Sequence, residues 1–136
     1  MKIWLNHIGV AVADPAGLTR TLELLGFGKT HVEDVPEQGV RTHFIPLSQT
    51  TTQVELLEVT DPEGTVAKFL EKKGPGVHHL SFEVERGALD VLMAKLAAAG
   101  LQWIYPAPKP GAHGMRVNFV HPKSAGGVLI ELMEKA

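Results

Sequence analysis

Two histidines and two glutamates recur at matching places in the two halves of the chain. His7 lies in the strand-like segment NHIGVAV, and His79 lies in the similar segment HHLSFEV. Glu55 and Glu131 interrupt two apolar segments, QVELLEV and VLIELME, that close the first and the second half. His79 follows His7 by 72 residues, and Glu131 follows Glu55 by 76 residues. Two imidazoles and two carboxylates are ligand types that suit a divalent metal of intermediate softness.

The two glutamates are the stronger evidence for a metal site. A single histidine in a strand is more often structural than metal-binding. A carboxylate among apolar strand residues is less usual, because burying it without a partner costs several kcal/mol. The simplest alternative places both glutamates on sheet faces that are wetted by solvent. The repetition of one His and one Glu in each half argues against that alternative, so we expect the four side chains to converge on one ion.

Hydrophobic periodicity predicts the elements that position these side chains. The alternation in segment 2–12 predicts a strand that places His7 and Val10 on opposite faces. The same reasoning predicts further strands at 29–35, 40–47, 52–59, 77–84, 101–105, 115–122 and 126–134, and helices after Asp14-Pro15, within 61–76 and at 86–99.

The predicted elements follow one order twice. A strand, a helix and three strands occur in a first module at about residues 2–60 and in a second module at about 76–135, within a single domain spanning 1–136. Two such modules predict an α+β fold in which a curved, cup-shaped mixed sheet surrounds the metal site and the helices lie on the outer face. The Pro/Gly-rich segment 106–114 is a candidate ligand-binding loop.

Composition excludes several classes of function. A net charge of −2 and scattered basic residues are not typical of a nucleic-acid-binding surface. The absence of cysteine excludes disulfides, thiolate zinc sites and a thiol nucleophile. No apolar run approaches the roughly 20 residues that span a bilayer, and the N-terminus does not have the pattern of a signal peptide. We therefore expect a cytoplasmic protein with no membrane or nucleic-acid partner.

The segments that carry these residues resemble a known superfamily. The paired strand–helix–strand–strand–strand modules, with His, Glu, His and Glu at these positions, resemble the vicinal-oxygen-chelate (glyoxalase/bleomycin resistance/dioxygenase) superfamily. Within it, the sequence is most similar to the methylmalonyl-CoA epimerase family. The matching segments are LNHIGVAV, PEQGV, GPGVHHLSFEV and, above all, GAHGMRVNFVHPKSAGGVLIEL. The resemblance covers nearly the whole chain.

The resemblance implies an isomerase that interconverts (2R)- and (2S)-methylmalonyl-CoA, as in propionyl-CoA metabolism. The implied reaction removes the acidic proton at C2, passes through an enolate and returns a proton to the opposite face. The implied metal ligands are His7, Glu55, His79 and Glu131, with Glu131 also as a catalytic acid or base. The implied ion is Co²⁺, with Mn²⁺, Zn²⁺ or Ni²⁺ as alternatives. Candidate contacts to the acyl-CoA are Lys123, Ser124 and His113, and the expected assembly is a homodimer.

One position departs from the family pattern. Some relatives have a second catalytic glutamate just after the PEQGV segment, where this chain has Thr42. Glu55, Glu83, His43 or a metal-bound water are the alternatives for that role, and the sequence does not distinguish between them. A second difference is Glu55 itself, since some epimerases of this kind have Gln there.

Three other functions are compatible with parts of this pattern. A glyoxalase-I-type lactoylglutathione lyase uses the same four ligands, although this sequence gives no strong indication of a glutathione site. An extradiol dioxygenase requires two His and one carboxylate with open positions for oxygen, and a second carboxylate at Glu55 would fill one of them. A metal-free drug-binding module of the resistance type has no use for carboxylates at both Glu55 and Glu131.

Overall fold

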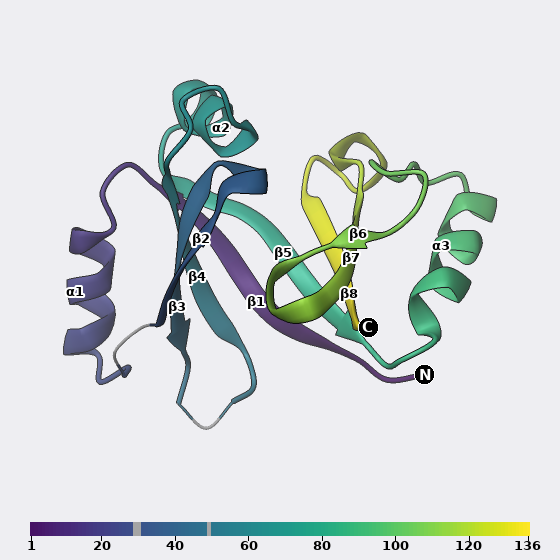
Figure 1. Ribbon diagram of the computed structural model, residues 1–136, viewed down its shortest axis with the longest axis horizontal. Helices are drawn as coiled ribbons and strands as arrows, with labels where there is room; N and C mark the ends of the chain where they lie inside the picture. Colours follow the sequence, from purple (N-terminus) through teal and green to yellow (C-terminus); the bar gives the residue numbers. More distant parts are fainter. Residues whose placement is uncertain (29–30, 49) are drawn as a thin grey trace. The chain divides into compact units, whose positions relative to one another are not determined.

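The computed structural model describes residues 1–28, 31–48 and 50–136, which form an α+β fold (Figure 1). Within these residues the elements are β1 (Ile3–Val12), α1 (Ala16–Leu24), β2 (His31–Val35), β3 (Val40–Pro46), β4 (Gln53–Val59), α2 (Thr65–Lys73), β5 (Gly76–Val84), α3 (Ala88–Ala98), β6 (Lys109–Pro110), β7 (Met115–Val120) and β8 (Leu129–Lys135). The predicted strand at 29–35 is observed from His31 onward, because residues 29 and 30 lie outside the described part of the chain. None of the helices in the described ranges is long and apolar enough to cross a bilayer.

The residues group into two compact units. One unit is the contiguous stretch His7–His78, and the other combines Met1–Asn6 with His79–Ala136. We call them the contiguous unit and the discontinuous unit. The bounds of these units differ from those of the predicted modules, about 2–60 and 76–135: the first six residues group with the second half, and residues 61–78 group with the first. Strands β1 and β5 therefore each run from one unit into the other, and they do so at the residues next to His7 and His79.

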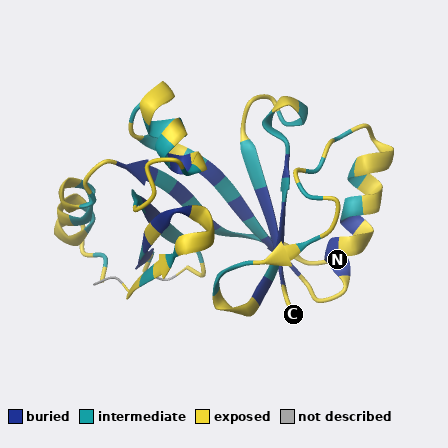
Figure 2. Cartoon of the chain, turned by 45° about the horizontal axis from the view of Figure 1, so that its top comes forward, coloured by how far each residue is buried: buried dark blue, intermediate teal, exposed yellow. Residues whose placement is uncertain are grey.

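In the contiguous unit the strand order is β2-β3-β4-β1. Strands β2, β3 and β4 pair antiparallel, whereas β4 and β1 pair parallel. Apolar residues of helix α1, Leu18 and Leu22, pack on one sheet face against Val12, Ile45 and Leu56. Figure 2 shows that burial is concentrated in the strands, whereas much of the helix surface is exposed.

Helix α2 covers the other face of the same sheet. Its Val66 packs against Ala11 and Leu57, which share the sheet face of His7 and Glu55. The prediction that helices lie on the outer face therefore holds for α1 and α3, the helices that the two modules share. The connecting helix α2 lies instead on the sheet face that carries His7 and Glu55, which we call the ligand face. The carbonyl of Gly39 accepts hydrogen bonds from the N–H groups of residues 60 and 61, which fixes the turn that leads from β4 toward α2.

In the discontinuous unit the strand order is β1-β5-β8-β7-β6, with β1 contributing its first residues. Strands β5 and β8 pair parallel, and β8, β7 and β6 pair antiparallel. Helix α3 buries Leu89 and Leu92 against Val84 and Leu132, on the face opposite to His79 and Glu131. This arrangement repeats that of α1 in the contiguous unit.

The predicted strand at 101–105 is wrong. This segment makes one isolated bridge, between Trp103 and Val120, and the short strand β6 forms later, within the predicted loop 106–114. The physical reason is that side chains take over part of the pairing. The backbone N–H of Gln102 donates to the hydroxyl of Ser124, and the backbone N–H of Tyr105 donates to the side chain of Asn118.

Candidate metal and catalytic site

The contiguous unit brings His7 and Glu55 together. Residue Gly9 of β1 pairs directly with Glu55 of β4, so His7 lies two residues before the paired position and on the same face. Its Nδ1 atom lies 2.9 Å from Oε2 of Glu55, and both side chains are buried. The parallel pairing of β1 with β4 thus creates the contact that the repeated pattern predicts within the first half.

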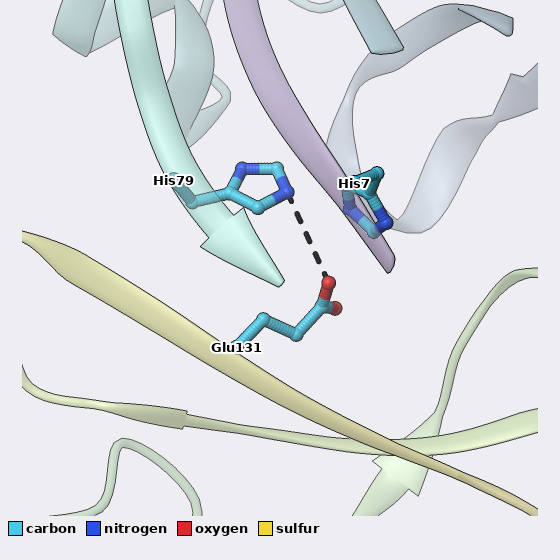
Figure 3. A group of neighbouring side chains, drawn as sticks. All are labelled: His7, His79 and Glu131. Carbon is cyan, nitrogen blue, oxygen red and sulfur yellow. Dashed lines mark ion pairs between the residues drawn. The ribbon is translucent and has the colours of Figure 1, made fainter. Parts of the chain in front are cut away.

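The discontinuous unit repeats the arrangement with His79 and Glu131. Ser81 of β5 pairs directly with Glu131 of β8, so His79 again lies two residues before the paired position. Figure 3 shows the imidazole of His79 directed at the carboxylate of Glu131, with Nε2 3.9 Å from Oε1. Both side chains are buried. Each unit therefore contains one buried His–Glu pair in the same register.

The donor set fits a divalent metal. Imidazole nitrogen and carboxylate oxygen bind such ions at about 2.1 Å, so two donors of one ion lie between about 3 Å (at a right angle) and about 4.2 Å (opposite) apart. The separations of 2.9 Å and 3.9 Å lie at or within these limits. Both glutamates are buried beside an imidazole, which is where a cation offsets the cost of removing the carboxylates from water.

Aromatic rings flank both pairs, and the sequence reasoning did not identify them. Phe44 of β3 pairs with Glu55, and Phe119 of β7 pairs with Glu131. The ring of Phe119 meets that of His79 edge to face, with centroids 6.4 Å apart. The repeat contains the signal that would have found them, because Phe119 follows Phe44 by 75 residues, close to the spacings of the His and Glu pairs.

Two alternatives for the second catalytic group have other partners. His43 pairs with Leu56 in the sheet and therefore faces the α1 side, away from Glu55, and its Nε2 lies 2.9 Å from Oε1 of Glu58. Glu83 shares the face of His79, and its Oε2 accepts a hydrogen bond of 2.9 Å from the side-chain amide of Asn6. Neither arrangement aims a free acid or base at the His–Glu pair of its own unit.

The departure at Thr42 lies on the ligand face of the contiguous unit. Thr42 is buried and pairs with Leu57 on one side and with Glu33 on the other. Leu57 is two residues after Glu55 on the same strand, so Thr42 lies on the same face as Glu55 but has no carboxylate. Thr42 thus places a hydroxyl at the position where some relatives are expected to have a second catalytic glutamate.

The predicted acyl-CoA contacts lie in two short turns of the discontinuous unit. Lys123 and Ser124 belong to the 3-10 turn Pro122–Ser124 that follows β7, and the hydroxyl of Ser124 accepts a hydrogen bond from the N–H of Gln102. Lys123 is exposed. His113 is also exposed and has a left-handed backbone conformation, with φ 57°. Their contact with a substrate remains a prediction.

Comparison with known sequences gives one consistent picture. Residues 6–119 match the family model described as the Glyoxalase/Bleomycin resistance protein/Dioxygenase superfamily. The ethylmalonyl-CoA/methylmalonyl-CoA epimerase of Cereibacter sphaeroides is 39% identical over 133 residues, which cover 94% of this chain and 95% of that protein. The mitochondrial methylmalonyl-CoA epimerase of Homo sapiens is 35% identical over 130 residues, which cover 94% of this chain and 72% of that protein.

Solved structures agree with the sequence comparison. The methylmalonyl-CoA epimerase from Mycobacterium tuberculosis superimposes with a TM-score of 0.88 at 37% identity, covering 97% of this chain and 87% of that chain. A methylmalonyl-CoA epimerase in complex with methylmalonyl-CoA and NH4+ gives a TM-score of 0.86 at 34% identity, covering 97% of this chain and 94% of that chain. The expected fold is thereby confirmed by both neighbours.

Proposed function

The chain belongs to the Glyoxalase/Bleomycin resistance protein/Dioxygenase superfamily, and we propose that within it the protein is a methylmalonyl-CoA epimerase. The observation that carries this proposal is the repeated buried His–Glu pair, in the same register in both units, in a chain whose near-full-length relatives bear that name. The substrate class is an acyl-CoA with an acidic C–H between a thioester and a carboxylate.

The proposed site joins the two pairs around one ion. His7, Glu55, His79 and Glu131 would hold a divalent cation, for which Co²⁺ is the first candidate and Mn²⁺, Zn²⁺ or Ni²⁺ are alternatives. Such an ion supplies positive charge next to the substrate's carbonyl oxygens, where negative charge develops when C2 loses its proton.

The residues of the chain perform the proton transfer. Glu131 is proposed to take the C2 proton, which requires its carboxylate to be free enough of the ion to act as a base, since coordination lowers basicity. The rings of Phe44 and Phe119 next to the two glutamates would exclude water from the reacting carbon. Lys123, Ser124 and His113 are proposed to bind the CoA portion, and the proposed assembly is a homodimer.

The test combines metal content with isotope exchange. The purified protein should contain about one divalent ion per chain and should exchange the C2 hydrogen of methylmalonyl-CoA with deuterium from D₂O. His79→Ala and His7→Ala should each lower the metal content, because each removes one nitrogen ligand. A wild-type protein that exchanges no hydrogen at C2 would contradict the proposed function.

The same preparation distinguishes the other superfamily activities. Turnover of methylglyoxal with glutathione would indicate a lactoylglutathione lyase instead. Bound iron with oxygen-dependent ring cleavage would indicate a dioxygenase, and an absence of stoichiometric metal in purified protein would favour a drug-binding module. The pair His7–Glu55 argues against the last of these, because a metal-free module has no need for a buried acid at this position.

A further inference from the structure

Lys109 of β6 lies on the same sheet face of the discontinuous unit as His79 and Glu131. Directly paired residues of neighbouring strands share a face, and Lys109 pairs with Val117 of β7, which in turn pairs with Met133 of β8. Met133 lies two residues after Glu131 on the same strand and therefore on the same face. Lys109 thus places a positive charge at the outer edge of this face, which we call the His79 face.

A row of aromatic contacts connects Lys109 to the pair of His79 and Glu131. The Lys109 ammonium lies 4.4 Å from the centre of the Tyr105 ring. That ring meets Phe119 edge to face, with centroids 6.1 Å apart, and Phe119 meets His79 in the same way at 6.4 Å. Phe119 also pairs directly with Glu131. The row therefore runs from the predicted metal ligands to the ammonium, and all of it lies within one unit.

The Tyr105 ring is supported from the sheet. The side-chain amide of the buried Asn118 accepts the backbone N–H of Tyr105 at 3.2 Å and donates to its carbonyl at 3.0 Å. The carbonyl of Phe119 accepts the N–H of Ile104 at 2.8 Å, which holds the preceding residue against β7. An aromatic ring attracts a cation over its face through its quadrupole. The ring is therefore held in place by the sheet, and it orients the Lys109 side chain.

The backbone next to Lys109 is also fixed. The N–H of Gly111 donates to the carbonyl of Met115 at 2.8 Å. A Cβ at position 111 would come within 2.6 Å of a methyl group of Val117, so the chain here approaches β7 more closely than a residue with a side chain allows. Lys109 thus projects from a defined position within the segment 106–114 that the sequence predicts to be a ligand-binding loop.

Lys109 differs from Arg116, the other cation of the β6–β7 pairing, in the partners it has. Arg116 donates to Glu134 and to Asp90, so two carboxylates offset its charge. Within residues 1–28, 31–48 and 50–136, Lys109 forms no ion pair, and its partner is the ring of Tyr105. Lys109 is exposed, and an aromatic ring leaves the N–H groups of an ammonium able to donate to an anion.

We propose that Lys109 binds a phosphate of the CoA portion of the substrate. This inference rests on the proposed function, which places the reacting carbon beside Glu131. The substrate's carboxylate is one bond from that carbon, whereas the rings of Phe119 and Tyr105 lie between it and Lys109. The pantetheine arm separates the thioester from the phosphates of CoA, and its apolar portions pack along the two rings. The ammonium at the end of this row then meets a phosphate in a charge-assisted contact.

The experiment compares binding of methylmalonyl-CoA with binding of methylmalonyl-pantetheine, which lacks the phosphates, by titration calorimetry. Lys109→Ala should raise the dissociation constant for methylmalonyl-CoA by roughly 10-fold, because it removes one charge-assisted contact. It should leave the dissociation constant for methylmalonyl-pantetheine unchanged. Lys109→Arg should bind both ligands nearly as the wild type does, because it keeps the charge and stacks on aromatic rings.

The matched control is Lys95→Ala. It makes the same charge change at an exposed residue of α3, the helix that packs on the sheet face opposite to His79. Both ligands should bind to this variant as they do to the wild type.

The orienting role of Tyr105 has its own test. Tyr105→Leu removes the ring and should raise the dissociation constant for methylmalonyl-CoA by about 2- to 5-fold, whereas Tyr105→Phe keeps the ring and should bind like the wild type. In the double variant Lys109→Ala/Tyr105→Leu, loss of the ring should add nothing to the effect of Lys109→Ala, because the ring acts through the lysine. A further loss there would show that Tyr105 contacts the substrate itself.

Three results would overturn the assignment of Lys109. Unchanged binding of methylmalonyl-CoA by Lys109→Ala would show that this lysine makes no contact with the substrate. Equal losses for the CoA and pantetheine thioesters would place its contact on the carboxylate. Equal losses in Lys109→Ala and Lys95→Ala would indicate a general effect of net charge. A wild-type protein that shows Lys109-dependent binding but no C2 exchange would reject the proposed catalysis and leave this contact in place.

Discussion

The two His–Glu pairs occupy equivalent places in their sheets, but their surroundings differ. In both units the residue two after the His pairs with the Glu, and a phenylalanine pairs with that Glu from the other side. Nδ1 of His7 lies 2.9 Å from Oε2 of Glu55, whereas Nε2 of His79 lies 3.9 Å from Oε1 of Glu131. The looser pair is the one whose glutamate is proposed to leave the ion and act as a base.

The next row of each sheet differs more strongly. In the contiguous unit, Thr42 and Glu33 follow in register beside Leu57. In the discontinuous unit the equivalent residues are Val117 and Lys109, and the Lys109 ammonium lies 4.4 Å from the centre of the Tyr105 ring. The outer strand thus carries an acidic residue in one unit and a basic residue in the other. The comparison teaches that the two units repeat the buried His–Glu pair but differ in the next row of the sheet.

The opposite face of each sheet contains a second repeated pair. Arg41 lies opposite Glu58, and Arg116 lies opposite Glu134. Arg116 donates to Glu134 at 2.7 Å, and Glu134 is almost fully buried, where it also accepts the N–H of Leu89 at the start of α3. Arg41 is solvent-exposed and bonds mainly to Asp34, and this hydrogen bond raises the pKa of the Arg41 guanidinium. The same pair therefore has a structural role in only one unit.

The largest expected effect is a difference in turnover between variants at Glu131 and at Glu55. Glu131→Gln should lower turnover by about 100- to 10,000-fold while keeping most of the metal, because it removes a general base but leaves an oxygen donor. Glu55→Gln, the matched change in the other unit, should retain the ion and lose much less turnover. The measurements are kcat with methylmalonyl-CoA and metal content per chain. Wild-type deuterium incorporation at C2 by Glu131→Gln would count against its role, and equal losses in both variants would remove the distinction.

A second prediction compares the two arginines by stability. Arg116→Met should lower the free energy of unfolding by about 3 kcal/mol, because it leaves the buried Glu134 carboxylate without its cation. Arg41→Met should leave the urea midpoint nearly unchanged, because exposed ion pairs contribute little. Urea unfolding of both variants measures the difference. Similar midpoints for the two variants would show that burial of Glu134 does not set the stability of the discontinuous unit.

The smallest expected effect concerns the CoA portion of the substrate. Lys123→Ala should raise the KM for methylmalonyl-CoA by roughly 10-fold with kcat little changed, because a charge-assisted contact to a phosphate contributes about 1.5 kcal/mol or more. Lys72→Ala, an exposed lysine on α2 in the contiguous unit, is the charge-matched control. Steady-state kinetics at two salt concentrations measures both. An equal rise in KM for the two variants would indicate a general effect of net charge.

The pattern of residues predicts the fold and the ligand pairs because both depend on local rules. Period-two alternation and the doubled order of elements determine which face each His and Glu occupies, and the observed registers agree. The failed strand at 101–105 shows the limit of such rules, because the side chains of Asn118 and Ser124, distant in sequence, accept two backbone N–H groups of this segment.

Residues 1–6 belong to the discontinuous unit although they precede the contiguous unit in the sequence. This arrangement affects the order in which the two units fold during synthesis. The carbonyl of Lys2 accepts the N–H of Glu85, and Asn6 donates to Glu83, so residues 2 and 6 bond to residues made 83 and 77 positions later. Residues 7–78 have their own compact set of contacts by then. We expect the contiguous unit to fold first on the growing chain, with the leading strand segment held open until β5 emerges and the discontinuous unit closes around it.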